Sequence, residues 1–210
     1  VGRQQYPTGS SDFSAGLMKA KAKGAQVILP IFDMPQSGIL VKQWKTMHIP
    51  ALMAGFISPL AGPGAWKTFD GKIAGAMNCI FEIGNMPVPK VPKSVEFYEK
   101  YLKKYGKPIE AGHSPAPAYE MVYMLKEAIE RAGSVNGDKV VAALEKTDRQ
   151  GAMGRIKFGK DHQVIYGNNP EVEALGCMIQ WQEPGKRVIV YPPSVAEGKI
   201  QLPEGLKSLK

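Results

Sequence analysis

Residues 10–38 read SSDFSAGLMKAKAKGAQVILPIFDMPQSG and predict a helix, a buried strand and the start of a second helix. Asp12 is placed to cap the first helix, and Gly24 to end it in a left-handed conformation. The run VILPIF is continuously apolar, as in a parallel strand that is covered on both faces. Pro30 removes one backbone donor and marks the end of pairing along this strand. The stretch then reaches Asp33, which either contacts a ligand or only caps the next helix.

Helices and strands continue to alternate after this stretch. Residues 35–48 carry apolar side chains at helical spacing, and HIPALMAGF (48–56) and AGAMNCIFEIG (74–84) read as short buried strands. Strands and helices at this spacing form right-handed βαβ crossovers. The predicted fold class is therefore α/β, with a three-layer, open and mostly parallel sheet.

Proline marks a change of organisation after the third strand. Three prolines in NMPVPKVPK (85–93) forbid a regular helix or a central strand there. We expect three segments, residues 1–84, 85–160 and 161–210. The second should hold helices, the first of them packed through Val95, Tyr98, Leu102 and Tyr105, and the third should end in a β-hairpin around residues 183–186.

The net charge of +8 raises the question of a nucleic-acid partner. The basic residues, such as Lys19, Lys21 and Lys23, fall on predicted helix faces and are not interleaved with stacking aromatics in a recognisable motif. Such runs are typical of solvated faces, so we expect no nucleic acid. Cys79 and Cys177 lie far apart in sequence and are either two buried thiols or one disulfide.

Membrane and export signals are absent from the sequence as printed. It has no tract of eighteen apolar residues, so no membrane span is expected. The first residues, VGRQQYPTGSSDFS, lack a signal peptide, but a mature or truncated chain would read the same, so export remains open.

Motifs for catalysis are also missing from the sequence. It contains no GxSxG elbow, Walker A loop, GxGxxG fingerprint or HExxH pair, and its three histidines are isolated. We therefore expect no enzymatic activity, no metal and no cofactor.

Ligands of open α/β sheets bind beyond the carboxyl ends of the strands. Phe32 and Asp33 stand at one such end, and Gly55, Phe56 and Ile57 at the next, so these five residues are candidate ligand contacts. Packing in the core is the alternative for the two phenylalanines.

A third candidate site precedes a long predicted helix. His113 and Ser114 lie in AGHSPAPAYE, where the helix N-terminus exposes unpaired N–H groups. Ser114 either binds a small ligand or is simply the helix cap.

The order of segments resembles the branched-chain amino acid class of ABC-transporter solute-binding proteins. The resemblance rests on DFSAGLMKAKAKGAQVILPI, LVKQWKTMHIPALMAG, PAYEMVYMLKEAIERAGS, GRIKFGKDHQ and QWQEPGKRVIVYP. It implies the type I periplasmic-binding-protein fold, with two Rossmann-like lobes that trap a solute for delivery to a membrane permease. It also implies a periplasmic or extracellular protein, lipid-anchored or soluble. The alternative is a ligand-sensing receptor or regulator lobe of the same fold.

The resemblance begins in the middle of the family's second lobe, so the fold is expected to be incomplete at the N-terminus. Residues 1–84 would belong to the second lobe, 85–160 to the first, and 161–210 to a hairpin and tail near the hinge. Without a missing lobe or a second chain, the segment from Asn85 to Lys157 would expose apolar faces.

Position by position, the resemblance places Asp33 at a ligand-contacting aromatic and Ile57 at a glutamate that holds the ligand ammonium. Ser114 falls at an aromatic that covers the ligand side chain. The solute is thus expected to be an amino acid, an amide, or an aromatic or short-chain acid. Asp33 is then either the surviving anchor for an amine or a cap.

Overall fold

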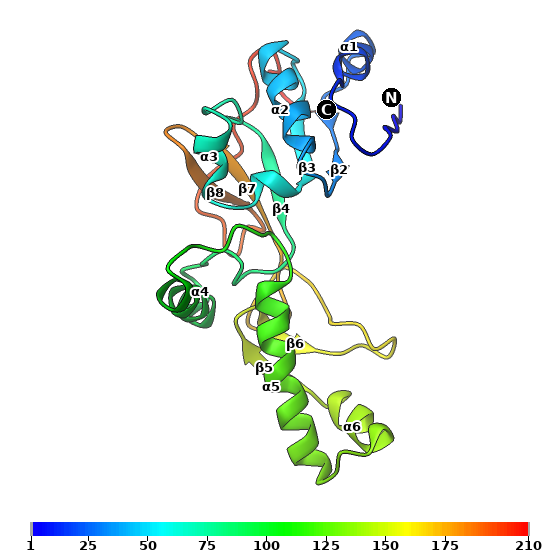
Figure 1. The fold of residues 1–210 in the computed structure, drawn as a ribbon, viewed down its shortest axis with the longest axis vertical. Coiled ribbons are helices and arrows are strands. Elements are labelled where there is room, and N and C mark those ends of the chain that lie inside the picture. Colours follow the sequence, from blue (N-terminus) through cyan, green and yellow to red (C-terminus); the bar gives the residue numbers. More distant parts are fainter. Residues whose placement is uncertain (1, 210) are drawn as a thin grey trace. The chain divides into compact units, whose positions relative to one another are not determined.

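The structure is a computed structural model that describes residues 2–209. Its contacts divide the chain into two compact units (Figure 1). Unit 1 contains the chain up to Cys79, residues 178–191 and the tail from Ala196, whereas unit 2 contains residues 80–177 and 192–195. The change of unit thus falls within strands instead of at the prolines of residues 85–93, which lie wholly in unit 2. Residues 161–177, expected with the tail, also belong to unit 2.

A six-stranded sheet has the strand order β1-β3-β4-β7-β8, with β2 also paired to β3. Its strands are β1 (Val27–Ile28), β2 (Ile31–Phe32), β3 (Leu52–Ile57), β4 (Met77–Ile80), β7 (Cys177–Gln182) and β8 (Lys186–Tyr191). Strands β1, β2 and β4 run parallel to β3, and β7 and β8 form the expected antiparallel hairpin. The predicted α/β class with a mostly parallel sheet is confirmed.

The opening stretch folds largely as its residues predict. Helix α1 (Ser14–Ala22) has Phe13, and not the predicted Asp12, as its N-cap. The Asp12 carboxylate accepts the Ser14 N–H at 2.9 Å from the preceding position, and Gly24 adopts a φ of 66° after the end of the helix, as predicted. The following strand differs from expectation. It is broken at Pro30 into β1 and β2, and Leu29 and Ile31 are 70% and 77% exposed. The prediction that this strand is covered on both faces is wrong, because the alternate side chains Val27, Leu29 and Ile31 are exposed, so nothing among residues 2–209 covers the face that they share.

The core of unit 1 joins helix α2 (Ser37–Thr46) to the sheet. Leu40, Val41 and Trp44 on α2 are buried, as is almost all of β3. The Trp44 indole donates to the Ala51 carbonyl at 2.8 Å, so its polar atom is satisfied inside the core. A 3₁₀ turn, η1 (Ser58–Leu60), and a short helix, α3 (Ala65–Thr68), complete this helical layer.

Unit 2 contains three helices, α4 (Pro92–Tyr105), α5 (Pro115–Ala132) and α6 (Gly137–Leu144). They pack with an antiparallel hairpin, which is formed by β5 (Asp148–Gly151) and β6 (Gly154–Lys157). The stripe predicted for α4 is wrong at its end, since Leu102 and Tyr105 are exposed. Phe97 is buried instead, with Tyr101 packed beside the same core, because the helix presents this pair, four residues apart, to the unit.

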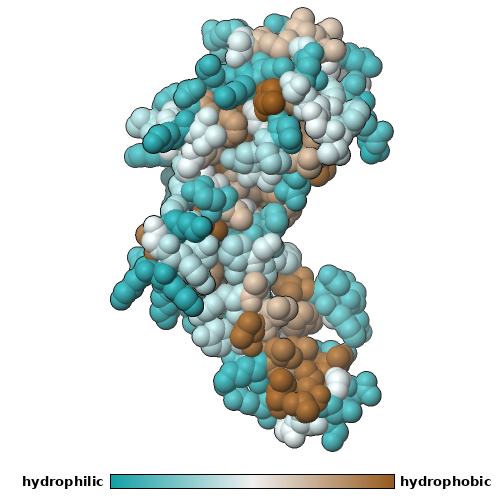
Figure 2. Space-filling model, viewed as in Figure 1, coloured by the Kyte–Doolittle hydropathy of each residue, from teal (hydrophilic) through white to brown (hydrophobic). Residues whose placement is uncertain are grey.

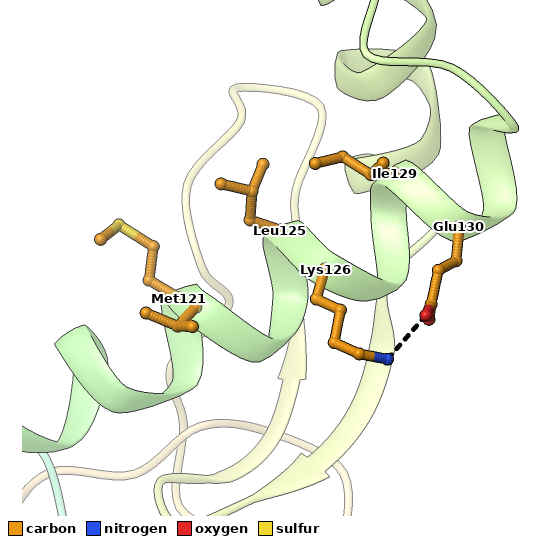
Figure 3. Close-up of a pocket in the computed structure, with 6 residues that line it drawn as sticks. Met121, Leu125, Lys126, Ile129 and Glu130 are labelled. Carbon is orange, nitrogen blue, oxygen red and sulfur yellow. Dashed lines mark hydrogen bonds and ion pairs between the residues drawn. The ribbon is translucent and has the colours of Figure 1, made fainter.

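Part of the apolar surface of α5 is uncovered, as the sequence led us to expect. Met121, Val122 and Leu125 are exposed. Figure 2 shows a brown, hydrophobic patch in its lower half, in the region where Figure 1 draws α5. The three exposed residues border an open depression of about 490 Å3. Figure 3 shows Met121, Leu125 and Ile129 projecting from the helix beside the Lys126–Glu130 ion pair.

Cys79 and Cys177 form no disulfide, and Cys177 is buried whereas Cys79 is partly buried. This decides between the two alternatives that the sequence left open.

No helix within residues 2–209 is long and apolar enough to cross a membrane.

Candidate functional site

In unit 1, the parallel pairing of β2 and β3 brings the first group of candidate residues together. Phe32 stands opposite Ile57 in the register, and Ile31 opposite Phe56. Both strands therefore end at the same edge of the sheet, and Asp33 follows directly from β2. The Phe32 ring also packs on Phe13, with their centroids 5.8 Å apart.

Gly55 lets the neighbouring chain approach β3 closely. A Cβ atom at this position would lie 2.1 Å from the Pro30 carbonyl oxygen. That oxygen accepts the Phe56 N–H at 2.9 Å, in place of regular strand pairing at Pro30. This hydrogen bond depends on the absence of a side chain at Gly55. The geometry gives Gly55 a role in packing.

The remaining candidates on these strands differ sharply in exposure. Phe56 is buried, and Ile57 is fully buried, with its N–H donated to Asn78 Oδ1 at 2.8 Å. Asp33 is exposed, and its carboxylate forms no hydrogen bond or ion pair with any other residue among 2–209. Helix α2 has Gln36 as its N-cap, without a side-chain capping bond, so the cap alternative for Asp33 is not supported.

In unit 2, His113 and Ser114 lie directly before α5. Ser114 occupies the N-cap position with a φ of 81°, but its side chain makes no capping bond. Its hydroxyl lies instead 2.7 Å from His113 Nδ1. The capping acceptor comes from the loop after β4, where buried Asn85 accepts the Ala116 N–H at 2.8 Å. The Ser114 hydroxyl is thus not engaged in holding the helix.

Glu82 joins this second group, although the sequence reasoning missed it. Asn85 Nδ2 donates to Glu82 Oε2 at 2.9 Å, and the Ser114 N–H also donates to the Glu82 carboxylate. Burial raises the pKa of Glu82, and these hydrogen bonds and the proximity of His113 only partly oppose the shift. The rule that selected Asp33 did not reach Glu82, because the sequence analysis placed Glu82 inside the strand predicted for residues 74–84, whereas β4 ends at Ile80.

Two aromatic residues extend the Glu82 group. Phe81 packs edge-on against His113, with ring centroids 6.3 Å apart. Burial and the nearby charge of Glu82 raise the pKa of Tyr166 to about 12, so this phenol keeps its proton at neutral pH. Together the residues offer a carboxylate, an imidazole, hydroxyl groups and aromatic faces, which suits the binding of a small polar molecule.

The structure therefore collects the seven candidate residues in two places. Phe32, Asp33, Gly55, Phe56 and Ile57 belong to unit 1, while His113 and Ser114 belong to unit 2. Within residues 2–209, no group of three or more His, Cys, Asp or Glu side chains is arranged to hold a metal ion.

Comparison with known proteins adds to this geometry. A family model described as periplasmic binding protein matches residues 1–168. The Leu/Ile/Val-binding protein homolog 7 of Brucella melitensis is 27% identical over 206 residues, which cover 96% of this chain and 50% of that protein.

Solved structures agree with the sequence comparison. A leucine-binding protein from Thermotoga maritima superposes with a TM-score of 0.69 at 22% identity, over 89% of this chain and 49% of that one. A solute-binding protein of an ABC transporter from R. palustris, in complex with benzoate, gives 0.65 at 10% identity, over 96% and 51%. The chain thus spans about half the length of the curated relatives it matches.

Proposed function

Because this chain belongs to the periplasmic binding protein family, we propose that it forms part of the solute-binding component of an ABC importer. The component captures an amino acid or a related small organic molecule between two lobes and delivers it to a membrane permease. The match of the family model to residues 1–168 carries this proposal. The candidate residues also accord with a binding role, because they offer ligand contacts. We could assign no catalytic nucleophile with an adjacent general base among them, so the protein that we propose is not an enzyme.

We assign unit 1 to the second lobe and unit 2 to the first. The chain passes between the units after Cys79, Cys177, Tyr191 and Val195, and these passages are the proposed hinge. The ligand would act by binding the closed arrangement of the lobes more tightly than the open one.

The proposed ligand carries an ammonium group, with Asp33 as its anchor. Asp33 is exposed and has no charged partner among residues 2–209, whereas Ile57 is an apolar core residue and cannot replace an acid. A carboxylate without a cation partner is suited to bind an amine through a charge-assisted hydrogen bond. The names of the Brucella relatives, Leu/Ile/Val-binding proteins, favour an amino acid over the amides and acids that the sequence left open.

The uncovered apolar surfaces suggest further polypeptide. Leu29 and Ile31 on the sheet edge and Met121 and Leu125 on α5 would be covered by the rest of a longer chain or by a second chain. The proposed location is periplasmic or extracellular, either lipid-anchored or free.

The test uses the longest natural polypeptide that contains this chain. Calorimetric titration and thermal unfolding against amino acids, amides and aromatic or short-chain acids identify the solute. Failure of every compound to bind would refute the proposed function and favour a sensor with another ligand.

The anchor is tested in the same protein by Asp33→Asn, with Asp70→Asn as a matched control, since Asp70 is also an exposed acid of unit 1. Asp33→Asn should weaken binding of the amino acid about tenfold or more, because a charge-assisted hydrogen bond becomes neutral, without a change in melting temperature. Unchanged affinity would remove Asp33 from the site while leaving solute capture intact.

A further inference from the structure

The positive charge of this protein is concentrated in one of its units. Unit 1 contains 13 Lys and Arg against 6 Asp and Glu, whereas unit 2 contains 14 against 13. Unit 1 therefore accounts for +7 of the net charge of +8. The excess of positive charge in unit 1 therefore calls for an explanation within that unit. The composition of the whole chain does not show that the charge is unevenly distributed.

Much of the excess lies on the helical layer of unit 1, formed by α1, α2 and α3 (Figure 1). The sequence from Phe13 to Phe69 contains a single acid, Asp33, and none of these helices contains one. Six lysines lie in or directly after the three helices: Lys19, Lys21, Lys23, Lys42, Lys45 and Lys67.

Three lysines of this layer have no carboxylate partner among the described residues. Lys19, Lys21 and Lys67 are exposed and form no ion pair with any residue in the described range 2–209. Lys45 donates to the Ala74 carbonyl, and Lys42 lies over the Phe69 ring. In unit 2, by contrast, lysines such as Lys100 and Lys126 pair with glutamates one helical turn away.

Helix dipoles explain only part of this distribution. Lys19, Lys21, Lys45 and Lys67 occupy the last turns of their helices, where a cation is favourable. The same effect favours acids in the first turns, yet the first turns of α1, α2 and α3 contain none. Asp12 before α1 and Asp70 after α3 are the acids that border this layer. The six lysines outnumber them, so the layer keeps an excess of positive charge that attracts anions at long range.

We propose that the helical layer of unit 1 docks on an anionic phospholipid surface. The helical cations of this layer are all lysines, and lysine is depleted at protein interfaces, where arginine is enriched. Arginine provides the planar fork that fixes a carboxylate in a specific geometry, whereas lysine is a mobile point charge. Mobile charges suit a fluid layer of phosphate headgroups better than an acidic protein surface. The docking goes beyond solute capture and does not depend on it.

The expected effect follows from the number of lysines removed. Each lysine near an anionic bilayer contributes about 1 kcal/mol, which corresponds to about a fivefold change in binding. Replacing Lys19, Lys21 and Lys67 with Gln should therefore weaken binding to the order of a hundredfold. Because the attraction is screened within a Debye length, salt should reduce binding by the parent protein as well.

The experiment measures sedimentation of the purified protein with vesicles of phosphatidylcholine containing about 30% phosphatidylglycerol, and with vesicles of phosphatidylcholine alone. Phosphatidylcholine vesicles control for the exposed apolar surface of α5, which does not discriminate by lipid charge. The matched control replaces Lys103, Lys104 and Lys107 of unit 2 with Gln, which removes the same charge from exposed positions. Circular dichroism checks that both triple variants are folded.

Three results together support the proposal: binding only to the anionic vesicles, loss of binding in high salt, and loss with the unit 1 triple but not the unit 2 triple. Absence of binding to anionic vesicles would overturn it. Equal losses with the two triples would also overturn it, since net charge and not the helical layer would then govern attraction. Binding to polyglutamate but not to vesicles would assign the layer to an acidic protein instead.

Discussion

Replacing Glu120 with Ala should destabilise unit 2 more than any exposed charge replacement on the same helix. Glu120 lies on α5 and is only 1% exposed, yet it carries a carboxylate. Its Oε2 accepts Arg149 Nε at 2.7 Å, and its Oε1 accepts the Ala152 N–H at 2.5 Å. The side chain thereby ties α5 to the β5–β6 hairpin, while Glu127 provides Arg149 with a second partner.

The magnitude follows from what each group loses. Removing one partner of a buried ion pair costs about 3–5 kcal/mol, because the other charge is left desolvated. Arg149 keeps Glu127 and is 18% exposed, so we expect the lower end of this range, about 3 kcal/mol. Glu120→Gln should cost about 1–2 kcal/mol, since its single carbonyl oxygen can serve only one of the two donors.

The pKa of Arg149 agrees with this balance of effects. Burial alone would lower the pKa of its guanidinium, but the hydrogen bond to Glu120 and the charges of Glu120 and Glu127 raise it overall. An arginine guanidinium does not lose its proton in proteins, so Arg149 remains charged even when Glu120 is removed. The loss of Glu120 cannot be relieved by deprotonation of Arg149.

Urea unfolding followed by circular dichroism measures the loss, and hydrogen exchange at the Ala152 amide localises it. Glu130→Ala is the matched control on α5, because Glu130 forms an exposed ion pair with Lys126 and should cost no more than about 0.5 kcal/mol. A loss below about 1 kcal/mol for Glu120→Ala, or one equal to that of the control, would refute the reasoning.

Three further changes test other parts of the structure. Because burial raises the pKa of Glu82, the folded state holds this proton more tightly, so stability should fall as pH rises from 4.5 through the raised value. Glu82→Gln should remove that fall, seen as a melting-temperature difference from the parent that grows between acid and neutral pH. Gly55→Ala should destabilise unit 1 by about 1–3 kcal/mol in urea unfolding, because its Cβ would meet the Pro30 carbonyl. Gln180→Ala should speed amide exchange in the C-terminal tail and cost about 2–3 kcal/mol, since this buried amide exchanges hydrogen bonds with the tail backbone.

The sequence was informative where local chemistry decides the structure. Gly24 lies just beyond the end of α1 because a left-handed residue ends a helix within a few positions of the chain. The Asp12 carboxylate likewise accepts an N–H of the first turn, although Phe13 holds the N-cap position. The hairpin of β7 and β8 is likewise set by its own turn. Such features need no knowledge of the rest of the molecule.

Prediction failed where a distant neighbour decides burial. The run from Val27 to Phe32 is apolar throughout, but composition cannot show that one of its faces is left uncovered by the described residues. In α4, several phases of the helix carry large apolar side chains, so periodicity alone could not select Phe97 over Leu102. Packing against the hairpin and α5 made that choice.

The candidate site divides in the same way. Asp33 follows from the rule that ligands bind beyond strand ends, and its exposure keeps it a candidate. Asn85 could not be found by such a rule, because it caps a helix that begins thirty residues later in the chain. Because Asn85 provides this cap, the Ser114 side chain makes no capping hydrogen bond to the helix.

The charge of unit 1 bears on the proposal that Asp33 anchors the ligand. Asp33 is the single acid between Phe13 and Phe69, in a unit with an excess of positive charge. A ligand that is only a cation would be repelled at long range by the unit as a whole, even if Asp33 attracts it at contact. A zwitterion escapes this conflict, because its carboxylate is attracted by the same field that opposes its ammonium group. If Asp33 is the proposed anchor, we therefore expect a neutral α-amino acid to bind better than a lysine-like or polyamine solute, and this preference to weaken as added salt screens the field.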